Sequence, residues 1–260
     1  MDSGSIESLG SDLYEAWLTR QVVEPLKGRY GSLSIDDSYA IQRVFVESRI
    51  RGGASLIGKK IGVTSRAVMR MLEVYQPDFG VLLSDMLFSD GQAIEVQQFI
   101  QPKIEGEIAF VLKQDLAGPG VGVAQVLAAT ECLVPCLEIV DSRIRDWRIT
   151  IEDTIADNAS CGALVLGGGA VDPLDVELAE CGMVLERNGE IFGTGAGAAA
   201  LGSPANSVAW LANTLGRFGS GLRAGEVVLS GALSGMAQVV KGDCFHVSIG
   251  GIGDCEARFS

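Results

Sequence analysis

The sequence predicts an α+β fold, in which a helical amino-terminal region precedes a mixed, mostly antiparallel β-sandwich or rolled sheet. Helical periodicity is concentrated in the first fifth of the 260 residues. From residue 93 onward, short β-like runs dominate and only two helical segments interrupt them. No internal repeat or linker divides the chain. We therefore expect one domain over residues 1–260, with a helical portion at 1–53 and a β-rich core at 54–260.

The amino-terminal portion contains two segments with the periodicity of amphipathic helices, at residues 9–30 and 36–51. Ser34 or Asp36 can cap the second helix, and the glycines at 52 and 53 can end it. A short strand over 55–62 and a helix over 65–72 follow.

The β-rich part is predicted from short apolar or alternating runs. They lie at residues 93–96, 103–112, 133–140, 160–166, 182–192, 226–230, 237–240 and 244–249. The two interrupting helices are expected at 123–132 and 204–218, the second with Pro204 in its first turn. Gln-Pro-Asp-Phe-Gly at 76–80 is typical of a turn.

Composition and charge exclude several classes of partner. The chain carries 20 Lys and Arg against 33 Asp and Glu, a formal net charge of −13. This balance disfavours nucleic acids and anionic membranes, both of which attract clustered basic residues. The first residues are polar and acidic, unlike a secretory signal, and no apolar stretch is long enough to span a membrane. We therefore expect a cytoplasmic protein with no nucleic-acid or membrane partner.

The six cysteines also fit a reducing compartment. They are Cys132, Cys136, Cys161, Cys181, Cys244 and Cys255. None of their spacings matches a zinc site or a redox motif, so we expect reduced thiols in the core.

Three carboxylates occupy positions where strands are otherwise apolar. Glu105 and Glu107 lie in Lys-Ile-Glu-Gly-Glu-Ile-Ala-Phe-Val-Leu at 103–112, and Glu138 interrupts Val-Pro-Cys-Leu-Glu-Ile-Val at 134–140. Side chains alternate along a strand, so Glu105 and Glu107 share a face. Buried carboxylates without compensation would protonate, whereas a divalent cation with oxygen ligands, Mg²⁺ or Mn²⁺, would stabilise their charges. The alternative is a solvated strand face for the pair, with Glu138 unrelated; Glu138 favours the metal site because its strand is apolar on both faces.

Lys59 and Lys60 lie in an apolar strand, and alternation turns one of them inward. Lys60 is the better candidate because it lies nearer the turn at 62–65. A lysine beside a metal or in a dry pocket has a lowered pKa, which suits proton transfer. The alternative is that both amines extend to water.

Several polar residues could support such a site. Asp78 could orient a polar group, although aspartate in a turn usually accepts a backbone hydrogen bond. Asp-Ser-Arg at 141–143 and the polar stretch at 153–160 could hold metal ligands in place.

Two other patterns carry less weight. Residues 193–202 are rich in glycine but lack the spacing of a dinucleotide-binding loop, so a close-packed turn is expected there. His246, the only histidine, is expected as an ordinary strand residue, and no Gly-x-Ser-x-Gly elbow accompanies it.

An ordered set of motifs, spread from about residue 10 to the end, resembles the 2-keto-4-pentenoate hydratase family of the fumarylacetoacetate hydrolase superfamily. The motifs are Gly-Lys-Lys-Ile-Gly-Val-Thr-Ser at 58–65, Gln-Pro-Asp-Phe-Gly at 76–80, Pro-Lys-Ile-Glu-Gly-Glu-Ile-Ala-Phe at 102–110, Leu-Glu-Ile-Val-Asp-Ser-Arg at 137–143, Ala-Asp-Asn-Ala-Ser at 156–160 and Val-Ala-Trp-Leu-Ala-Asn at 208–213.

The resemblance implies a β-rich fold with a helical amino-terminal region and a role in meta-cleavage breakdown of aromatic compounds. It places the metal ligands at Glu105, Glu107 and Glu138, the active-site lysine at Lys60, and pocket residues at Asp78 and Ser160. The implied substrate is 2-hydroxypenta-2,4-dienoate or a substituted relative. The implied reaction adds water at C4 to give a 4-hydroxy-2-oxo acid. The resemblance also suggests a homo-oligomer that associates with the decarboxylase of the pathway.

Three alternatives remain open at this point. A 4-oxalocrotonate decarboxylase resembles the chain in most of the same motifs, although residues 76–80 and Leu-Ser-Gly-Ala-Leu at 229–233 look more like the hydratase branch. The carbon–carbon bond hydrolases of the superfamily fit less well, because the only histidine lies near the carboxyl terminus. A non-catalytic scaffold has no need for Lys60 and the three glutamates together.

Overall fold

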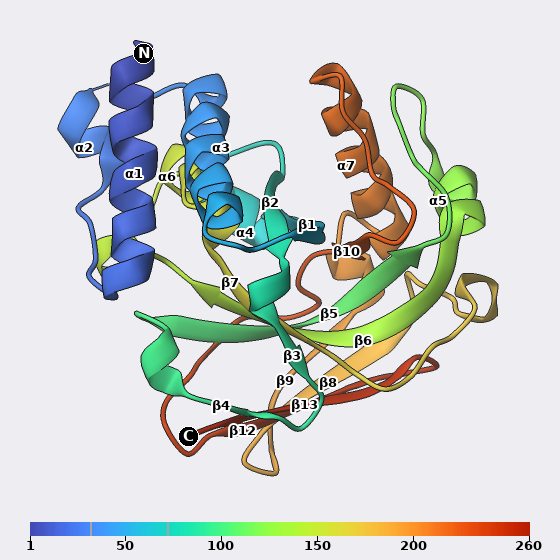
Figure 1. Cartoon of the computed structure of the whole chain (residues 1–260). Coiled ribbons are helices and arrows are strands. Elements are labelled where there is room, and N and C mark those ends of the chain that lie inside the picture. Colours follow the sequence, from blue (N-terminus) through green and yellow to red (C-terminus); the bar gives the residue numbers. More distant parts are fainter. Residues whose placement is uncertain (32, 72) are drawn as a thin grey trace.

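The computed structural model describes residues 1–31, 33–71 and 73–260, in which two β-sheets are flanked by helices (Figure 1). The strands are β1 (Leu56–Gly62), β2 (Asp78–Leu83), β3 (Leu87–Ser89), β4 (Ala93–Ile94), β5 (Pro102–Leu112), β6 (Thr130–Asp141), β7 (Cys161–Leu166), β8 (Gly182–Arg187), β9 (Glu190–Ala196), β10 (Val227–Leu229), β11 (Ala237–Gln238), β12 (Cys244–Ile249) and β13 (Gly253–Phe259). The helices are α1 (Ser3–Thr19), α2 (Leu26–Tyr30), α3 (Ile35–Arg51), α4 (Arg66–Met71), α5 (Val123–Ala129), α6 (Ile151–Ala156) and α7 (Pro204–Arg217).

The larger sheet has the strand order β2-β1-β10-β5-β6-β7-β3, with β11 also paired to β5, and the smaller has the order β4-β13-β12-β8-β9. Most neighbouring strands are antiparallel, and β1–β10, β3–β7 and β4–β13 are parallel. The predicted α+β class with a mixed, mostly antiparallel sheet arrangement is confirmed.

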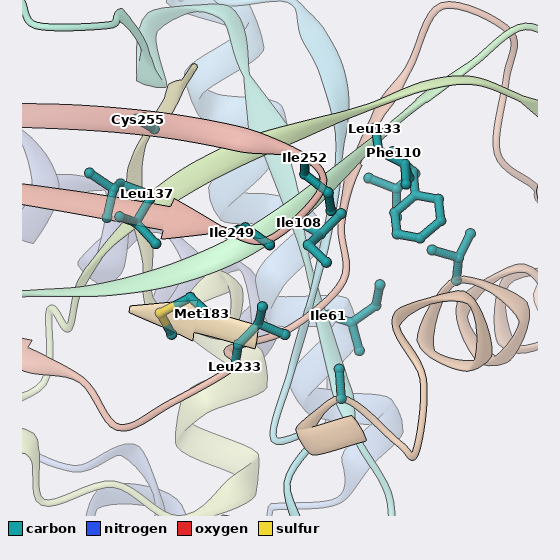
Figure 2. Packing of buried hydrophobic residues seen from close by; sticks show 14 of the residues in the cluster. Ile61, Ile108, Phe110, Leu133, Leu137, Met183, Leu233, Ile249, Ile252 and Cys255 are labelled. Carbon is teal, nitrogen blue, oxygen red and sulfur yellow. The ribbon is translucent and has the colours of Figure 1, made fainter. Parts of the chain in front are cut away.

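The long strands β5 and β6 form the centre of the fold, with the smaller sheet on one side and the helices on the other (Figure 1). Ile104, Ile108, Phe110 and Leu112 of β5 all lie in the core cluster shared with the smaller sheet, as their alternation predicts. Figure 2 shows Ile108 and Leu137 packed near Met183, Ile249 and Cys255. The odd-numbered side chains of β5 point to the opposite face of the sheet.

That opposite face meets a second cluster built from the amino-terminal helices. Leu9 and Leu13 of α1 pack with Ile41 and Phe45 of α3, and Ala109 of β5 belongs to the same cluster. The helices therefore cover part of the sheet face that carries the odd-numbered side chains of β5.

The amino-terminal helices differ from the prediction in one respect. One helix over 9–30 was expected, but α1 begins at Ser3, where the Asp2 carboxylate accepts a hydrogen bond from Ser5 N at 2.9 Å, and it ends at Thr19. Arg20 has the left-handed φ of 59°, and Pro25 then precedes α2. The break follows because neither conformation continues a helix.

The second predicted helix is confirmed as α3. Ser34 is its cap and forms a reciprocal capping box with Asp37, and Gly52 stands at its end. The expected helix over 65–72 is present as α4, and Leu72 lies outside the described residues.

Three other expectations are wrong in detail. Residues 182–192 form the hairpin of β8 and β9 because Asn188 and Gly189 adopt φ of 57° and 82°, the conformations of a tight hairpin turn. The helix expected over 123–132 ends at Ala129, after which the chain enters β6. A turn was expected over 76–80, but strand β2 already begins at Asp78.

Within the described residues, none of the helices is both long and apolar enough to cross a membrane. The six cysteines are free thiols, as expected. His246 lies in β12.

Candidate metal centre and active site

The pairing of β5 with β6 brings the three predicted carboxylates together. Glu105 lies directly opposite Glu138 in this antiparallel pair, and Glu107 is opposite Cys136 on the same face. One carboxylate oxygen from each glutamate lies within 4.8 Å of the others. Glu107 and Glu138 are fully buried, and Glu105 is 8% exposed. The solvated-face alternative for Glu105 and Glu107 is therefore wrong.

The cluster is electrostatically unfavourable without a cation. Burial and the charge of Glu138 raise the pKa of Glu105 to about 7, against the opposing effect of Lys60. Burial, followed by the charges of Glu138 and Glu105, raises the pKa of Glu107 well above its usual value. The raised pKa values mean that burial and mutual repulsion disfavour the ionised form of both acids in the folded chain.

The carboxylate oxygens are also short of hydrogen-bond donors. Glu107 Oε2 accepts from Gly231 N at 2.8 Å, but Glu107 Oε1 and Glu138 Oε2 receive no hydrogen bond from the described residues. Glu138 Oε1 is 3.1 Å from Lys60 Nζ in an ion pair that is not aligned as a hydrogen bond. Converging, buried and unsatisfied oxygens are the donor set that a hard divalent cation takes. The residues present fit such an ion.

Lys60 lies beside this cluster on β1. Its Nζ is 3.1 Å from Glu138 Oε1 and donates a hydrogen bond to the Ala159 carbonyl at 3.1 Å. Lys59 points to the other face of the strand and pairs with Glu226 Oε2 at 2.9 Å. Both lysines are buried, so the alternative in which both amines reach water is wrong.

The charge of Lys60 differs from the prediction. Burial alone would lower the pKa of this amine, but the charges of Glu138, Glu105 and Asp78 outweigh burial and raise it above the usual range. The prediction took account of burial and of a nearby metal, both of which lower the pKa of a lysine. It left out the charges of the neighbouring carboxylates, which raise the pKa when no cation is bound. In the metal-free chain Lys60 is therefore a protonated ammonium.

Asp78 faces Lys60 from the first position of β2 and is fully buried. Burial raises its pKa to about 6, with Lys60 opposing the shift and Glu138 adding to it. The amides of Asp78 and Gly62 favour the anion, yet neither carboxylate oxygen receives a well-aligned hydrogen bond from the described residues. A Cβ at Gly62 would lie 2.3 Å from Asp78 Oδ1, so only glycine leaves room for this carboxylate.

Ser160 ends a turn of three consecutive left-handed residues. Asn158, Ala159 and Ser160 have φ of 56°, 50° and 50°, a conformation that costs about 1 to 2 kcal/mol per residue for L-amino acids. The Asn158 amide holds the turn to β2, because Oδ1 accepts from Val81 N at 2.7 Å and Nδ2 donates to Val81 O at 2.9 Å. The turn carries the carbonyl that contacts Lys60.

A cavity of about 430 Å³ opens beside these groups. Its lining includes Lys60, Asp78, Glu105 and Ser160, while Glu107 and Glu138 lie outside the lining. Apolar side chains form much of the remaining wall, namely Ile61, Val63, Val68, Val140, Ile149 and Met236. All six predicted site residues therefore meet at or next to one cavity.

The lining also includes Lys103 and Trp147, two polar or aromatic side chains that were not predicted as site residues. Lys103 Nζ lies 4.1 Å from the centre of the Trp147 ring. Lys103 precedes Glu105 by two positions, so strand periodicity already places it on the same face. No sequence pattern indicated Trp147, because it lies in a short segment after β6, outside any regular strand or α-helix. Its φ of 54° is in the left-handed region.

Comparisons with known proteins agree with this geometry. The family described as fumarylacetoacetate hydrolase C-terminal matches residues 59–260. The chain is 57% identical to a 2-hydroxypent-2,4-dienoate hydratase from Pseudomonas putida over 84% of this chain and 99% of the relative. It is 48% identical to a 2-hydroxyhexa-2,4-dienoate hydratase from Comamonas testosteroni over 100% of this chain and 99% of that one.

Among solved structures, 4-oxalocrotonate decarboxylase from Pseudomonas putida G7, complexed with magnesium and adipate, superimposes with a TM-score of 0.97. Its sequence is 32% identical, and the alignment covers 100% of this chain and 99% of that one. The helical amino-terminal region is thus part of the shared structure. The sequence and structural matches show that this chain belongs to the 2-keto-4-pentenoate hydratase family of the fumarylacetoacetate hydrolase superfamily.

Proposed function

We propose that the chain is a metal-dependent hydratase that adds water to 2-hydroxypenta-2,4-dienoate, or a substituted relative, in meta-cleavage breakdown of aromatic compounds. The product would be a 4-hydroxy-2-oxo acid. The observation that carries this proposal is the buried cluster of three carboxylates beside Lys60, at the wall of a largely apolar cavity. Relatives named as hydratases of such dienoates, at 57% and 48% identity, support the same reaction.

Glu105, Glu107 and Glu138 would hold the divalent ion, and Mg²⁺ and Mn²⁺ are the candidates because every donor is an oxygen. When bound, the ion supplies a Lewis acid for the carboxylate and 2-oxygen of a 2-oxo acid. Structures of the related decarboxylase are described as complexes with magnesium and with calcium, which supports a divalent ion of the hard class.

Lys60 would move the proton between the substrate carbons and oxygen. Its ammonium is fixed by Glu138 and the Ala159 carbonyl, so one proton has a defined direction. The carboxylate charges keep the amine protonated in the metal-free chain. Neutralising those charges would leave burial as the dominant effect, and burial favours the neutral amine that accepts a proton.

Asp78 and Ser160 would position the attacking water or the enol. Asp78 has a pKa raised to about 6, so its carboxyl group can exchange a proton near neutral pH. Ser160 lies on the cavity wall, next in sequence to the Ala159 carbonyl that accepts from Lys60. The apolar side chains around them would exclude other water molecules and accept the uncharged end of a dienoate.

Decarboxylation of 4-oxalocrotonate is the second candidate function. The TM-score of 0.97 with a decarboxylase favours it, and Lys103 supplies a cation on the cavity wall that could face a second carboxylate. Sequence identity favours the hydratase, at 57% against 32%. Release of CO₂ from the dicarboxylate, assayed beside hydration of the monocarboxylate, separates the two.

The assembly state is a separate part of the proposal. We propose a homo-oligomer that associates with the decarboxylase of the same pathway, and both statements rest on the likeness to the hydratase family. Light scattering of the purified chain, alone and mixed with that decarboxylase, tests both statements. A single monomeric mass in both samples would contradict them.

The direct test is an absorbance assay on freshly generated 2-hydroxypenta-2,4-dienoate. Purified protein with Mg²⁺ or Mn²⁺ should consume the dienoate and produce 4-hydroxy-2-oxopentanoate. Excess chelator should abolish turnover, and added metal should restore it. Full activity after exhaustive chelation would exclude the proposed mechanism.

A further inference from the structure

We propose that Arg143 and Asp157 are positioning residues that fix the Ser160 hydroxyl as a hydrogen-bond acceptor toward the cavity. The same pair would hold the backbone of the left-handed turn that carries Ser160. The inference rests on the proposed function, in which Lys60 and Ser160 act in the pocket. It adds a direction to the Ser160 hydrogen bond and assigns a role to two charged residues outside the cavity lining.

The first step is the surroundings of Asp157, which is fully buried. Its Oδ1 accepts from Arg143 Nε at 2.5 Å. Its Oδ2 accepts from Ser142 Oγ at 3.2 Å, from Arg143 N at 3.1 Å and from Ser160 Oγ at 3.1 Å. Every one of these groups donates, so the carboxylate acts only as an acceptor.

Burial raises the pKa of the Asp157 carboxyl to about 6, and Arg143 opposes that shift, so the carboxylate is the main form at neutral pH. The guanidinium is 1% exposed, and Nη1 donates to the carbonyls of Asp141 at 2.7 Å and Cys161 at 2.9 Å. Nη2 donates to the Asp157 carbonyl, so the side chain binds both the acid and the backbone of the turn. A planar group with several donors is required for this arrangement, and lysine offers only a point charge.

The consequence concerns the proton of Ser160. A serine hydroxyl has one proton and two lone pairs, and its proton is directed to Asp157. Ser160 lines the cavity, so a group bound there that reaches the hydroxyl would meet its lone pairs. The hydroxyl therefore accepts a proton-bearing group, such as a water O–H or an enol O–H, and does not donate to a substrate oxygen.

Asp157→Asn tests this positioning with almost no change in shape. In either orientation of the new amide, its nitrogen would face a donor of Arg143, either Nε or the backbone N, so the contacts that hold the turn and the Ser160 hydroxyl would weaken. We expect kcat for dienoate hydration to fall at least 10-fold, KM to change less than threefold, and Mn²⁺ affinity to stay within threefold of the wild-type value.

A double-mutant cycle separates positioning from a general structural effect. If Asp157 acts through Ser160, adding Asp157→Asn to Ser160→Ala should change kcat less than twofold beyond Ser160→Ala alone. Multiplication of the two losses, or wild-type kcat in Asp157→Asn, would overturn the proposal. Arg143→Lys covers the case in which Asp157→Asn does not fold: it should lower kcat in the wild-type background and have little effect in Ser160→Ala.

A measurement without substrate tests, independently of the proposed function, whether Arg143 and Asp157 hold the turn in place. Deuterium exchange of the amides at 156–162 should accelerate at least 10-fold in metal-free Asp157→Asn. Glu226→Gln, which disrupts the buried ion pair with Lys59, should leave both this exchange and kcat unchanged. Unchanged exchange in Asp157→Asn would overturn the proposal, whereas a wild-type protein that fails to hydrate the dienoate would overturn the proposed function alone.

Discussion

The fold buries two groups of charged side chains that differ in how well their charges are satisfied. Around Asp157, each carboxylate oxygen accepts hydrogen bonds, and Arg143 supplies the opposite charge. In the cluster of Glu105, Glu107 and Glu138, three acids converge within 4.8 Å beside one lysine, and several oxygens lack a donor among the described residues. Both groups are buried to a similar degree.

The difference shows how a binding site can be distinguished from a structural ion pair. A buried charge with a full set of partners can hold a segment in place, and removal of one partner is costly because it leaves the other charge uncompensated. A buried charge without partners destabilises the folded chain until a ligand supplies the missing interactions. Mutations should therefore change stability in opposite directions at the two groups.

Glu107→Gln should have the largest effect, on metal binding. Loss of one ligand charge should weaken Mn²⁺ affinity by more than about 100-fold, since even outer partners of metal ligands contribute 10- to 100-fold. In chelated protein at pH 8, the same change should raise the free energy of unfolding by about 1 to 3 kcal/mol, because a buried like charge is removed. Calorimetry and urea unfolding measure the two effects.

The matched change at the satisfied group is Asp157→Asn. It should lower the free energy of unfolding by about 3 kcal/mol, because Arg143 loses its counter-ion. The contrast between the two groups fails if both substitutions shift stability in the same direction.

The pH dependence of metal-free stability is the next effect. The pKa of Glu105 is raised in the folded chain to about 7, so between about pH 4 and 7 the folded state binds more protons than the unfolded state. Stability should therefore fall as pH rises through this window, on the order of 3 kcal/mol for this one group. Urea unfolding in chelator from pH 4 to 8 checks the sign. Saturating Mn²⁺ should remove the decline, and a metal-free protein that gains stability over this window would contradict the pKa assignment.

Lys60→Ala should reduce turnover by about 100-fold or more if the amine transfers a proton. Lys59→Ala is the matched control, because Lys59 is equally buried but pairs with Glu226 on the other strand face. The control should lose stability and retain most of its kcat per folded molecule. Equal kcat losses in both variants would show that burial, and not the site, governs the effect.

The smallest expected effect concerns Gly62. Gly62→Ala places a Cβ 2.3 Å from Asp78 Oδ1 and 3.4 Å from Lys60 Nζ, so Asp78 must shift. We expect kcat to fall about 10-fold, as a displacement near 1 Å can cost up to about 100-fold. Gly182→Ala, where a Cβ meets nothing within 4 Å, should keep wild-type kcat. A wild-type rate in Gly62→Ala would show that the position of Asp78 does not limit turnover.

Much of the site could be predicted because side chains two positions apart in a strand lie on the same face of the sheet. Glu105 and Glu107 share a face for that reason, and Glu138 stood out against its apolar neighbours. Alternation and the nearby turn also favoured Lys60 over Lys59, and the resemblance to a known family then strengthened Lys60 and Asp78 and added Ser160 as a pocket residue. The ligand and proton-transfer roles of these residues stay predictions until the experiments are done.

The remaining features depend on contacts between distant segments. The raised pKa of Lys60 follows from carboxylates on other strands, which local sequence does not show. The left-handed turn at Asn158–Ser160 has no glycine and persists because Asp157 and Val81 hold it. The end of α1 at Thr19 was not predicted because the helical spacing of apolar residues continues past Arg20, although Arg20 itself adopts a left-handed conformation that ends the helix.

The most direct test of the central claim is the position of a bound ion. A crystal of the full chain soaked in Mn²⁺ should show one anomalous peak with oxygens of Glu105, Glu107 and Glu138 at about 2 Å, the distance typical of small hard cations. A peak elsewhere, or no peak at Mn²⁺ concentrations that support turnover, would contradict the account.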